Sequence, residues 1–127
     1  MHLSFEYDTN YFPAFPYLEM TIVGKRGGRE RVLDGLIDSG SDATQIPVRI
    51  LQEIGARKSD ERWVRDLSGI RYRVTLYKVW IQIGSLELYG IEVVGREGIS
   101  EIIVGRDVLN QLIVTLNGLA QVTEISD

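Results

Sequence analysis

The stretch of the sequence best suited to chemistry is residues 36–44, in which an acidic residue directly follows two aliphatic ones. Asp38 would stand at the end of a strand, with Ser39 and Gly40 in a tight loop behind it. A carboxylate that is held on a rigid strand and partly withdrawn from water is equipped to act as a general acid or base. Ser39 can hydrogen-bond across such a loop, and Gly40 lets another backbone approach closely. Taken alone, Asp-Ser-Gly is also an ordinary turn tripeptide.

Composition narrows the available chemistry to a few residue types. The 127 residues include no cysteine and a single histidine at position 2. Thiol nucleophiles and thiolate metal sites are therefore excluded, and we expect neither a histidine-based triad nor a polyhistidine metal site. No carboxylates have the spacing of a metal site, so we expect no metal and no other cofactor. Any catalysis must use carboxylates, hydroxyls, backbone groups, Lys or Arg.

The charge balance bears on the class of partner. There are 14 Lys and Arg against 18 Asp and Glu, which gives a net charge of −4. A negative chain is poorly suited to binding nucleic acid or an anionic membrane through a basic surface. No apolar run approaches the roughly 20 residues of a membrane-spanning helix, and the N-terminus lacks the pattern of a secretory signal. We therefore expect no nucleic acid or membrane partner, and a cytoplasmic location.

Alternating apolar and polar residues indicate that strands position Asp38. The alternation is clear in residues 18–22 and 79–83, and residues 102–104 have the composition of a buried strand. Two short helices are expected, one after Pro47 and one capped by Asp107. The sequence thus predicts an all-β, barrel-like domain with two short helices. Its predicted extent is residues 1–127, with an N-terminal arm (1–16), a projecting hairpin (62–78) and a C-terminal hairpin (113–125).

The segment leading to Asp38 allows two interpretations. Asp34-Gly35 is a strong hairpin-turn signal, which would break the chain just before residue 36. Apolar residues on both sides instead favour one continuous strand over residues 31–37. We expect the strand.

A second motif, residues 103–109, reads Ile-Val-Gly-Arg-Asp-Val-Leu and follows the first in chain order. The two motifs, with a hairpin between them, make the chain resemble a retropepsin-like (retroviral-type) aspartic protease over roughly residues 16–117. In that family the first motif is two apolar residues, Asp, Thr or Ser, Gly, Ala or Ser, Asp, any residue and Thr. The arm at residues 13–16 is more similar to bacterial than to viral members.

The resemblance implies a closed β-barrel that carries half of an active site per chain. Asp38 would be the catalytic acid and base, and the second carboxylate would come from another copy, because the sequence holds one such motif. Ser39 would brace the two loops, while Gly40 and Asp42 would lie along the substrate backbone. Arg106 would pair with Asp42 in a buried ion pair rather than a surface one.

The hairpin of residues 62–78 resembles the flap that closes over substrate in this family. Ser68, Gly69 and Ile70 at its tip would then contact the substrate. Viral flaps are richer in glycine, so the segment is also compatible with an ordinary exposed hairpin. Asp66-Leu67-Ser68-Gly69 imitates the first motif but lacks an apolar strand before it.

Three functions are compatible with these features. The first is a homodimeric aspartic endopeptidase that cleaves peptides without a cofactor. The second is a dimeric peptide-binding module of the same fold with weak or no catalysis. The third is a monomeric barrel in which Asp38 only shapes a turn. For the endopeptidase we expect an apolar substrate pocket, formed by Ile46, Ile70, Leu76 and Ile103.

Overall fold

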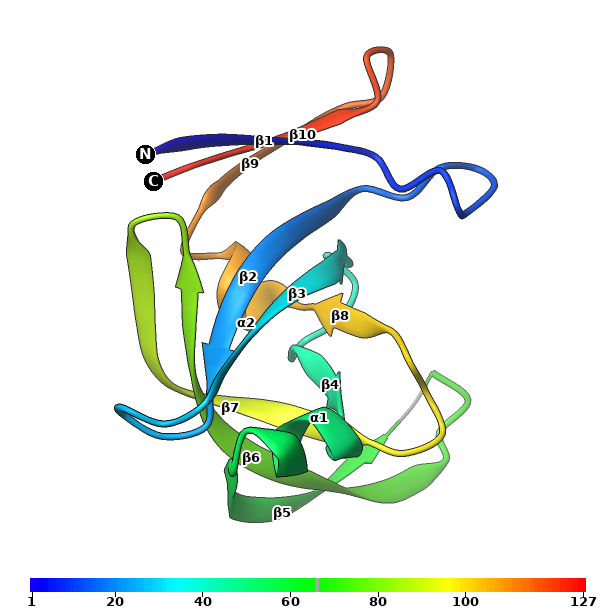
Figure 1. The fold of residues 1–127 in the computed structure, drawn as a ribbon. Coiled ribbons are helices and arrows are strands. Elements are labelled where there is room, and N and C mark those ends of the chain that lie inside the picture. Colours follow the sequence, from blue (N-terminus) through cyan, green and yellow to red (C-terminus); the bar gives the residue numbers. More distant parts are fainter. Residues whose placement is uncertain (66) are drawn as a thin grey trace.

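The computed structural model describes residues 1–65 and 67–127, and this part of the chain is mostly β-strand (Figure 1). In chain order the elements are β1 (His2–Glu6), β2 (Tyr17–Val23), β3 (Glu30–Ile37), β4 (Gln45–Pro47), α1 (Val48–Glu53), β5 (Arg57–Arg65), β6 (Arg71–Ile83), β7 (Leu86–Arg96), β8 (Ile102–Val104), α2 (Arg106–Leu109), β9 (Ile113–Asn117) and β10 (Val122–Ser126). The two helices are short and connect strands, so the site must be positioned by the sheets.

Six strands close on one another to form a barrel. The hydrogen-bonded order is β2-β3-β8-β4-β7-β6, and β6 pairs back onto β2, while β5 extends the sheet beyond β6. The pairs β3–β8 and β4–β7 are parallel, and the remaining pairs are antiparallel. The predicted all-β, barrel-like class with two short helices is confirmed.

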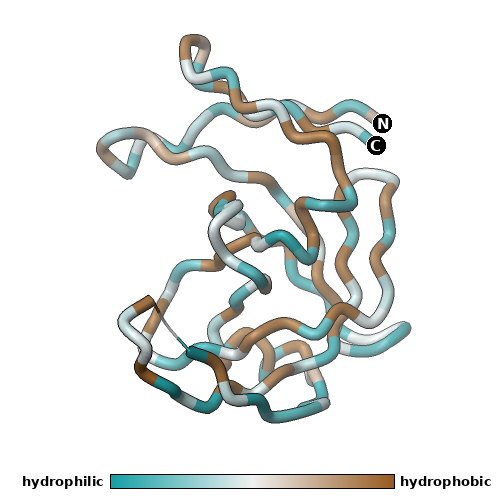
Figure 2. The backbone as a smooth tube through the Cα atoms, turned by 180° about the vertical axis from the view of Figure 1, so that it is seen from behind, coloured by the Kyte–Doolittle hydropathy of each residue, from teal (hydrophilic) through white to brown (hydrophobic). Residues whose placement is uncertain are grey.

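The core follows the alternation read from the sequence. In β2, Leu18, Met20 and Ile22 are at most 1% exposed, whereas Glu19 between them is exposed. Figure 2 shows hydrophobic and hydrophilic segments alternating along the strands. Because neighbouring side chains in a strand point to opposite faces, this pattern fixes which face of β2 lines the barrel.

A three-stranded sheet of β1, β10 and β9 is separate from the barrel sheet in its hydrogen bonding, packs Ile125 into the core and brings the two termini together (Figure 1). The amino group of Met1 donates a hydrogen bond of 3.0 Å to the Asp127 carboxylate, which lowers the pKa of Asp127. The sequence predicted only an extended arm over residues 1–16, but its first part is a strand paired with β10. Because the two strands come from opposite ends of the chain, no local sequence pattern predicts that they pair.

Both helices occur where short helices were expected, and each contributes buried side chains to the core. α1 follows Pro47 and buries Ile50 and Leu51, and the chain leaves it at Gly55 with a φ of 70°. A positive φ is easily adopted by glycine, which explains the stop. In the part of the chain that the structure describes, no helix has the length and apolar character needed to cross a bilayer.

Strand β3 runs without a break through Asp34 and Gly35, so the continuous-strand interpretation is confirmed. Gly35 pairs with Leu18 on one side and with Ile102 on the other. A Cβ at this position would lie 2.4 Å from Cγ2 of the buried Val104 side chain. Glycine is therefore needed here for the close approach of two strands rather than for a turn.

We predict that Gly35→Ala lowers the free energy of unfolding by about 1–3 kcal/mol, because the added methyl group overpacks the contact with Val104. Urea denaturation followed by circular dichroism measures this change. Gly118→Ala is the matched control, since a Cβ at Gly118 meets no atom within 4 Å. Equal stabilities of the two variants would contradict the proposed role of Gly35.

Candidate active site

Asp38 lies directly beyond the end of β3, one of the strands inside the barrel sheet. Its backbone N–H donates to the Val104 carbonyl at 3.1 Å, which extends the pairing with β8 by one residue. The Ser41 N–H donates to the Asp38 carbonyl at 3.1 Å and closes a tight turn. The Gly40 N–H donates to Oδ1 of Asp38 at 2.9 Å. The carboxylate is therefore held by its own loop, on a rigid strand end.

The loop of Asp38 is held from the other side by Arg106, at the start of α2. The Arg106 backbone N–H donates to the Ser41 carbonyl at 2.9 Å, and its guanidinium donates to the Ser39 carbonyl at 2.7 Å. The same guanidinium forms an ion pair with Asp42. The two sequence motifs thus meet in space, and one arginine links three residues of the Asp38 loop.

The predicted burial of the Arg106–Asp42 pair is wrong for the single chain. The Asp42 side chain is 90% exposed and that of Arg106 is 42% exposed. An exposed ion pair of this kind contributes little to stability. Its effect is to orient the loop. Asp38 is exposed as well, and the expected partial desolvation of its carboxylate is not met in one chain.

A second, buried anchor involves Thr44 and Asp107, neither of which was singled out as a site residue. The fully buried Thr44 donates through its backbone N–H to Asp107 Oδ2 at 2.9 Å and through Oγ1 to Asp107 Oδ1 at 2.7 Å. The Gly105 N–H in turn donates to Thr44 Oγ1 at 3.1 Å. Both residues belong to the two motifs, which was the signal available in the sequence.

The expected role of Asp107 as the cap of the second helix is wrong. Gly105 occupies the N-cap position of α2, and Asp107 lies within its first turn. The carboxylate of Asp107 accepts from the buried hydroxyl and N–H of Thr44, which need an acceptor. Its Oδ1 also accepts from the Val108 N–H at 2.9 Å, so Asp107 supports the first turn of α2 from within the helix.

Gly105 explains how the two loops come so close. A Cβ there would lie 2.6 Å from the carbonyl carbon of Ala43 and 2.9 Å from the Ser41 oxygen. Both neighbours are backbone atoms that cannot rotate away, so a larger residue would push the loops apart.

A cavity of about 450 Å³ lies beside Asp38. Its wall is partly apolar, from Val74 and Val94, and partly polar, from Gln45 and Arg96. Of the residues predicted to bind substrate, Gly40 and Asp42 line this cavity, whereas the hairpin-tip residues 68–70 do not.

The predicted apolar pocket is not formed as expected. None of Ile46, Ile70, Leu76 and Ile103 lines the cavity beside Asp38. Ile46 and Leu76 are in the core, 0% and 5% exposed, because their faces of the strands point inward. The sequence pattern marks these positions as apolar, but it cannot separate a core face from a cavity face.

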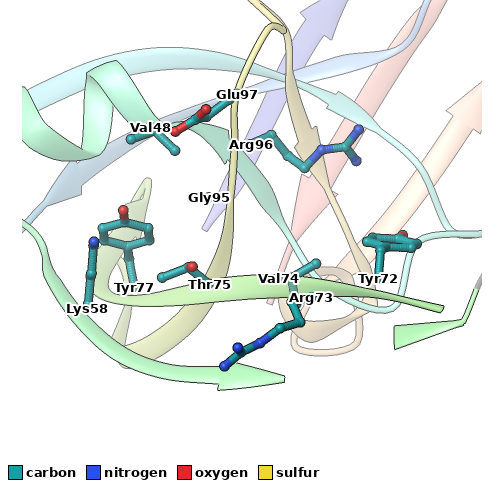
Figure 3. Close-up of a pocket in the computed structure, with 10 residues that line it drawn as sticks. All are labelled: Val48, Lys58, Tyr72, Arg73, Val74, Thr75, Tyr77, Gly95, Arg96 and Glu97. Carbon is teal, nitrogen blue, oxygen red and sulfur yellow. The ribbon is translucent and has the colours of Figure 1, made fainter. Parts of the chain in front are cut away.

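A second cavity, of about 360 Å³, adjoins the first and is drawn in Figure 3. Tyr72, Val74 and Arg96 line both cavities. Figure 3 shows the Arg96 side chain on the Tyr72 side of the strand, while Glu97 points toward Val48. Strands β6 and β7 therefore carry a continuous hollow that begins beside Asp38.

The chain is similar to known proteins in its structure but not in its sequence. No protein-family model matches it, and no curated protein is similar to it in sequence. The crystal structure of a retropepsin-like aspartic protease from Rickettsia conorii superposes on it with a TM-score of 0.67. That match covers 100% of this chain and 94% of the other, at 9% sequence identity. The chain has the retropepsin-like fold.

Within this retropepsin-like fold, β5 and β6 form the hairpin that was compared with a flap. Its turn includes Gly69 with a φ of 87°, and Ile70 beside it is 63% exposed. Trp63 on β5 packs under the guanidinium groups of Arg71 and Arg73, 5.0 and 5.8 Å from the ring centroid. Asp66 is the first residue of the segment 66–69, whose sequence is similar to the Asp38 motif. It lies outside the described residues.

The retropepsin-like chain offers a single Asp38 carboxylate at the cavity, with Asp42 engaged by Arg106. Two carboxylates that share a proton must lie within hydrogen-bonding distance of each other. Among the described residues, no three His, Asp or Glu side chains are grouped so that they could hold a metal ion.

We predict that Asp107→Ala lowers the free energy of unfolding by about 2–3 kcal/mol, because it leaves the buried N–H and hydroxyl of Thr44 without their acceptor. Thermal and urea denaturation measure the loss. Asp34→Ala removes an exposed carboxylate from β3 and serves as the control. If both variants were equally stable, Asp107 would not anchor the loop.

Proposed function

We propose that this protein is a homodimeric aspartic endopeptidase that cleaves extended peptide segments without a cofactor. The observation that carries the proposal is the placement of Asp38 at the end of β3, beside a cavity, in a loop held by Arg106. The retropepsin-like fold supports it, since the solved structure with that fold is named as an aspartic protease. Protomers of residues 1–127 would each supply one Asp38.

The proposed reaction is the attack of water on a peptide carbonyl. In the dimer the two Asp38 carboxylates would lie close together, so that one is ionised and one is protonated. The ionised carboxylate takes a proton from the water as it attacks, and the protonated one donates to the carbonyl oxygen. A tetrahedral intermediate forms and collapses when the amine leaves with a proton.

The remaining residues of the loop have supporting roles in this proposal. Ser39 braces the loop against its symmetry mate through its hydroxyl. Gly40 and Asp42 bind the substrate backbone, as their place on the cavity wall supports. Arg106 is a positioning residue, which acts through its hydrogen bond to Ser39 and its ion pair with Asp42.

The hairpin of residues 62–78 is proposed as the flap. The hairpin shares the cavity with the Asp38 loop, since Val64, Leu67 and Tyr72 also line it. Closure would bring Ser68, Gly69 and Ile70 onto the substrate and exclude water from the reaction.

The dimer is proposed to use the three-stranded sheet. Strand β9 is at the edge of that sheet, and Ile113 and Leu116 on it are 60% and 52% exposed. An apolar edge strand is prone to pair with another chain. The absence of cysteine fits the reducing cytoplasm, where we place the dimer.

We predict that the wild-type protein degrades an unstructured protein at about pH 4–7, the range of a shared-proton pair, and that Asp38→Asn does not. Gel electrophoresis and mass spectrometry of the products measure cleavage. Asp34→Asn removes the same charge from an exposed position of the same strand and should remain active. Activity that survived in Asp38→Asn would overturn the mechanism. If the wild type were an inactive dimer, the peptide-binding module would replace the enzyme.

We predict that Leu116→Glu converts the dimer to a monomer and abolishes cleavage, because a charge is placed on the proposed interface strand. Sedimentation velocity measures the mass, and cleavage is assayed on the same sample. Val32→Glu is the control, since Val32 is 60% exposed, close to the 52% of Leu116, but lies on β3 of the barrel. Deletion of residues 118–127 is a poorer test, because β10 contributes Ile125 to the core. A Leu116→Glu dimer would exclude this interface.

A further inference from the structure

The polar wall of the cavity beside Asp38 is built around Arg96, the last residue of β7. Its guanidinium donates to Oε1 of Gln45 at 2.8 Å, and the Gln45 amide donates to Ser41 Oγ at 3.1 Å. Ser41 Oγ then donates to the Ala43 carbonyl at 2.7 Å. This chain of hydrogen bonds fixes the orientation of Gln45 and, through it, the position of the guanidinium.

Arg96 differs from the arginines that form ion pairs in this structure. Arg31, Arg73 and Arg106 each pair with a carboxylate, whereas within residues 1–65 and 67–127 no carboxylate lies within ion-pair distance of Arg96. Its neighbour Glu97 points to the other side of the strand (Figure 3). The cavity therefore has a cation whose hydrogen-bond partner is a neutral amide.

The surroundings of Arg96 favour an anion in the cavity. The residue is half-buried, and Val74, Val94 and Tyr72 line the same space. A guanidinium has five N–H donors, and next to apolar walls its charge is less well solvated than in open water. The planar guanidinium can donate two parallel hydrogen bonds to one carboxylate. Arg65 adds a second positive charge to the cavity wall. Among the described residues, the negative charges on the same wall are Asp42, which is paired with Arg106, and Asp38.

We propose that Arg96, oriented by Gln45, makes this cavity a subsite for an acidic side chain of the substrate. The inference rests on the proposed function, and it replaces the apolar pocket expected from the sequence. In an extended peptide every second side chain points to the same side, so one position near the cleaved bond would enter the cavity. The substrate class is therefore peptides with Asp or Glu at that position, and Arg96 is a specificity-determining residue.

The first measurement maps cleavage sites in a mixture of unstructured peptides by mass spectrometry. We expect Asp and Glu to be enriched at one position close to the cleaved bond. A pair of peptides that differ only by Glu or Gln there is then compared by kcat/KM. The charge-assisted hydrogen bonds predict that wild type prefers the Glu peptide by about tenfold. Protonation of the substrate should remove the preference below about pH 4.3.

Variants test whether Arg96 is the source of the preference. Arg96→Gln should lose about tenfold in kcat/KM on the Glu peptide and keep its value on the Gln peptide. Gln45→Glu should have the same effect without removing the arginine, because it supplies an internal carboxylate for it. Arg31→Gln, an exposed arginine paired with Glu53, is the control for net charge.

The outcomes separate this inference from the proposed function. Equal cleavage of the Glu and Gln peptides by wild type would overturn the acidic subsite and leave the endopeptidase intact. If no peptide were cleaved, the endopeptidase would fail, and fluorescence anisotropy would compare binding of labelled Glu and Gln peptides to wild type and Arg96→Gln. A Glu preference lost in Arg96→Gln would support the subsite, and equal binding would overturn it.

Discussion

The contact between the loop that follows β3 and the loop that follows β8 is the interaction on which the site depends. The two strands are parallel neighbours, so their carboxyl ends reach the same edge of the barrel. Gly105 allows the backbones to touch, and the hydrogen bond from Asp38 to Val104 continues the pairing into the loops. Asp38 is thereby positioned by backbone geometry, which does not rely on its own side-chain contacts with the core.

This contact has a buried side, which stabilises the loop, and an exposed side, which contributes little to stability. Thr44 and Asp107 face inward, where an unpaired hydroxyl or N–H would cost about 1–3 kcal/mol, so they anchor the loop. Asp42 and Arg106 face outward, where their ion pair contributes little to stability and remains accessible to a substrate or a partner. The same two short motifs therefore supply both the buried support and the exposed part of the loop that carries Asp38.

Much of this arrangement could be predicted from the sequence, for a physical reason. Alternation identifies strands such as β2 because burial on one face requires it, and the motifs around Asp38 and Arg106 fix which loops meet. The pairing of β1 with β10 and the partner of Asp107 could not be predicted, because both depend on contacts between distant residues. The cavity wall was missed because an apolar residue type does not tell whether the side chain packs in the core, as Ile46 does, or lines the cavity, as Val94 does.

In a dimer, the polar wall of each cavity would influence which substrate side chains bind near Asp38. In a symmetric dimer each copy of Asp38 is accompanied by its own Gln45 and Arg96, so two equivalent cation sites would flank the cleaved bond. Attraction to Arg96 and repulsion from the Asp38 pair act in opposite directions on a bound carboxylate. An acidic side chain would thus be favoured only where Arg96 is nearer to it than the carboxylates are. Its distance from the cleaved bond would then be set by the spacing between the end of β3 and the end of β7.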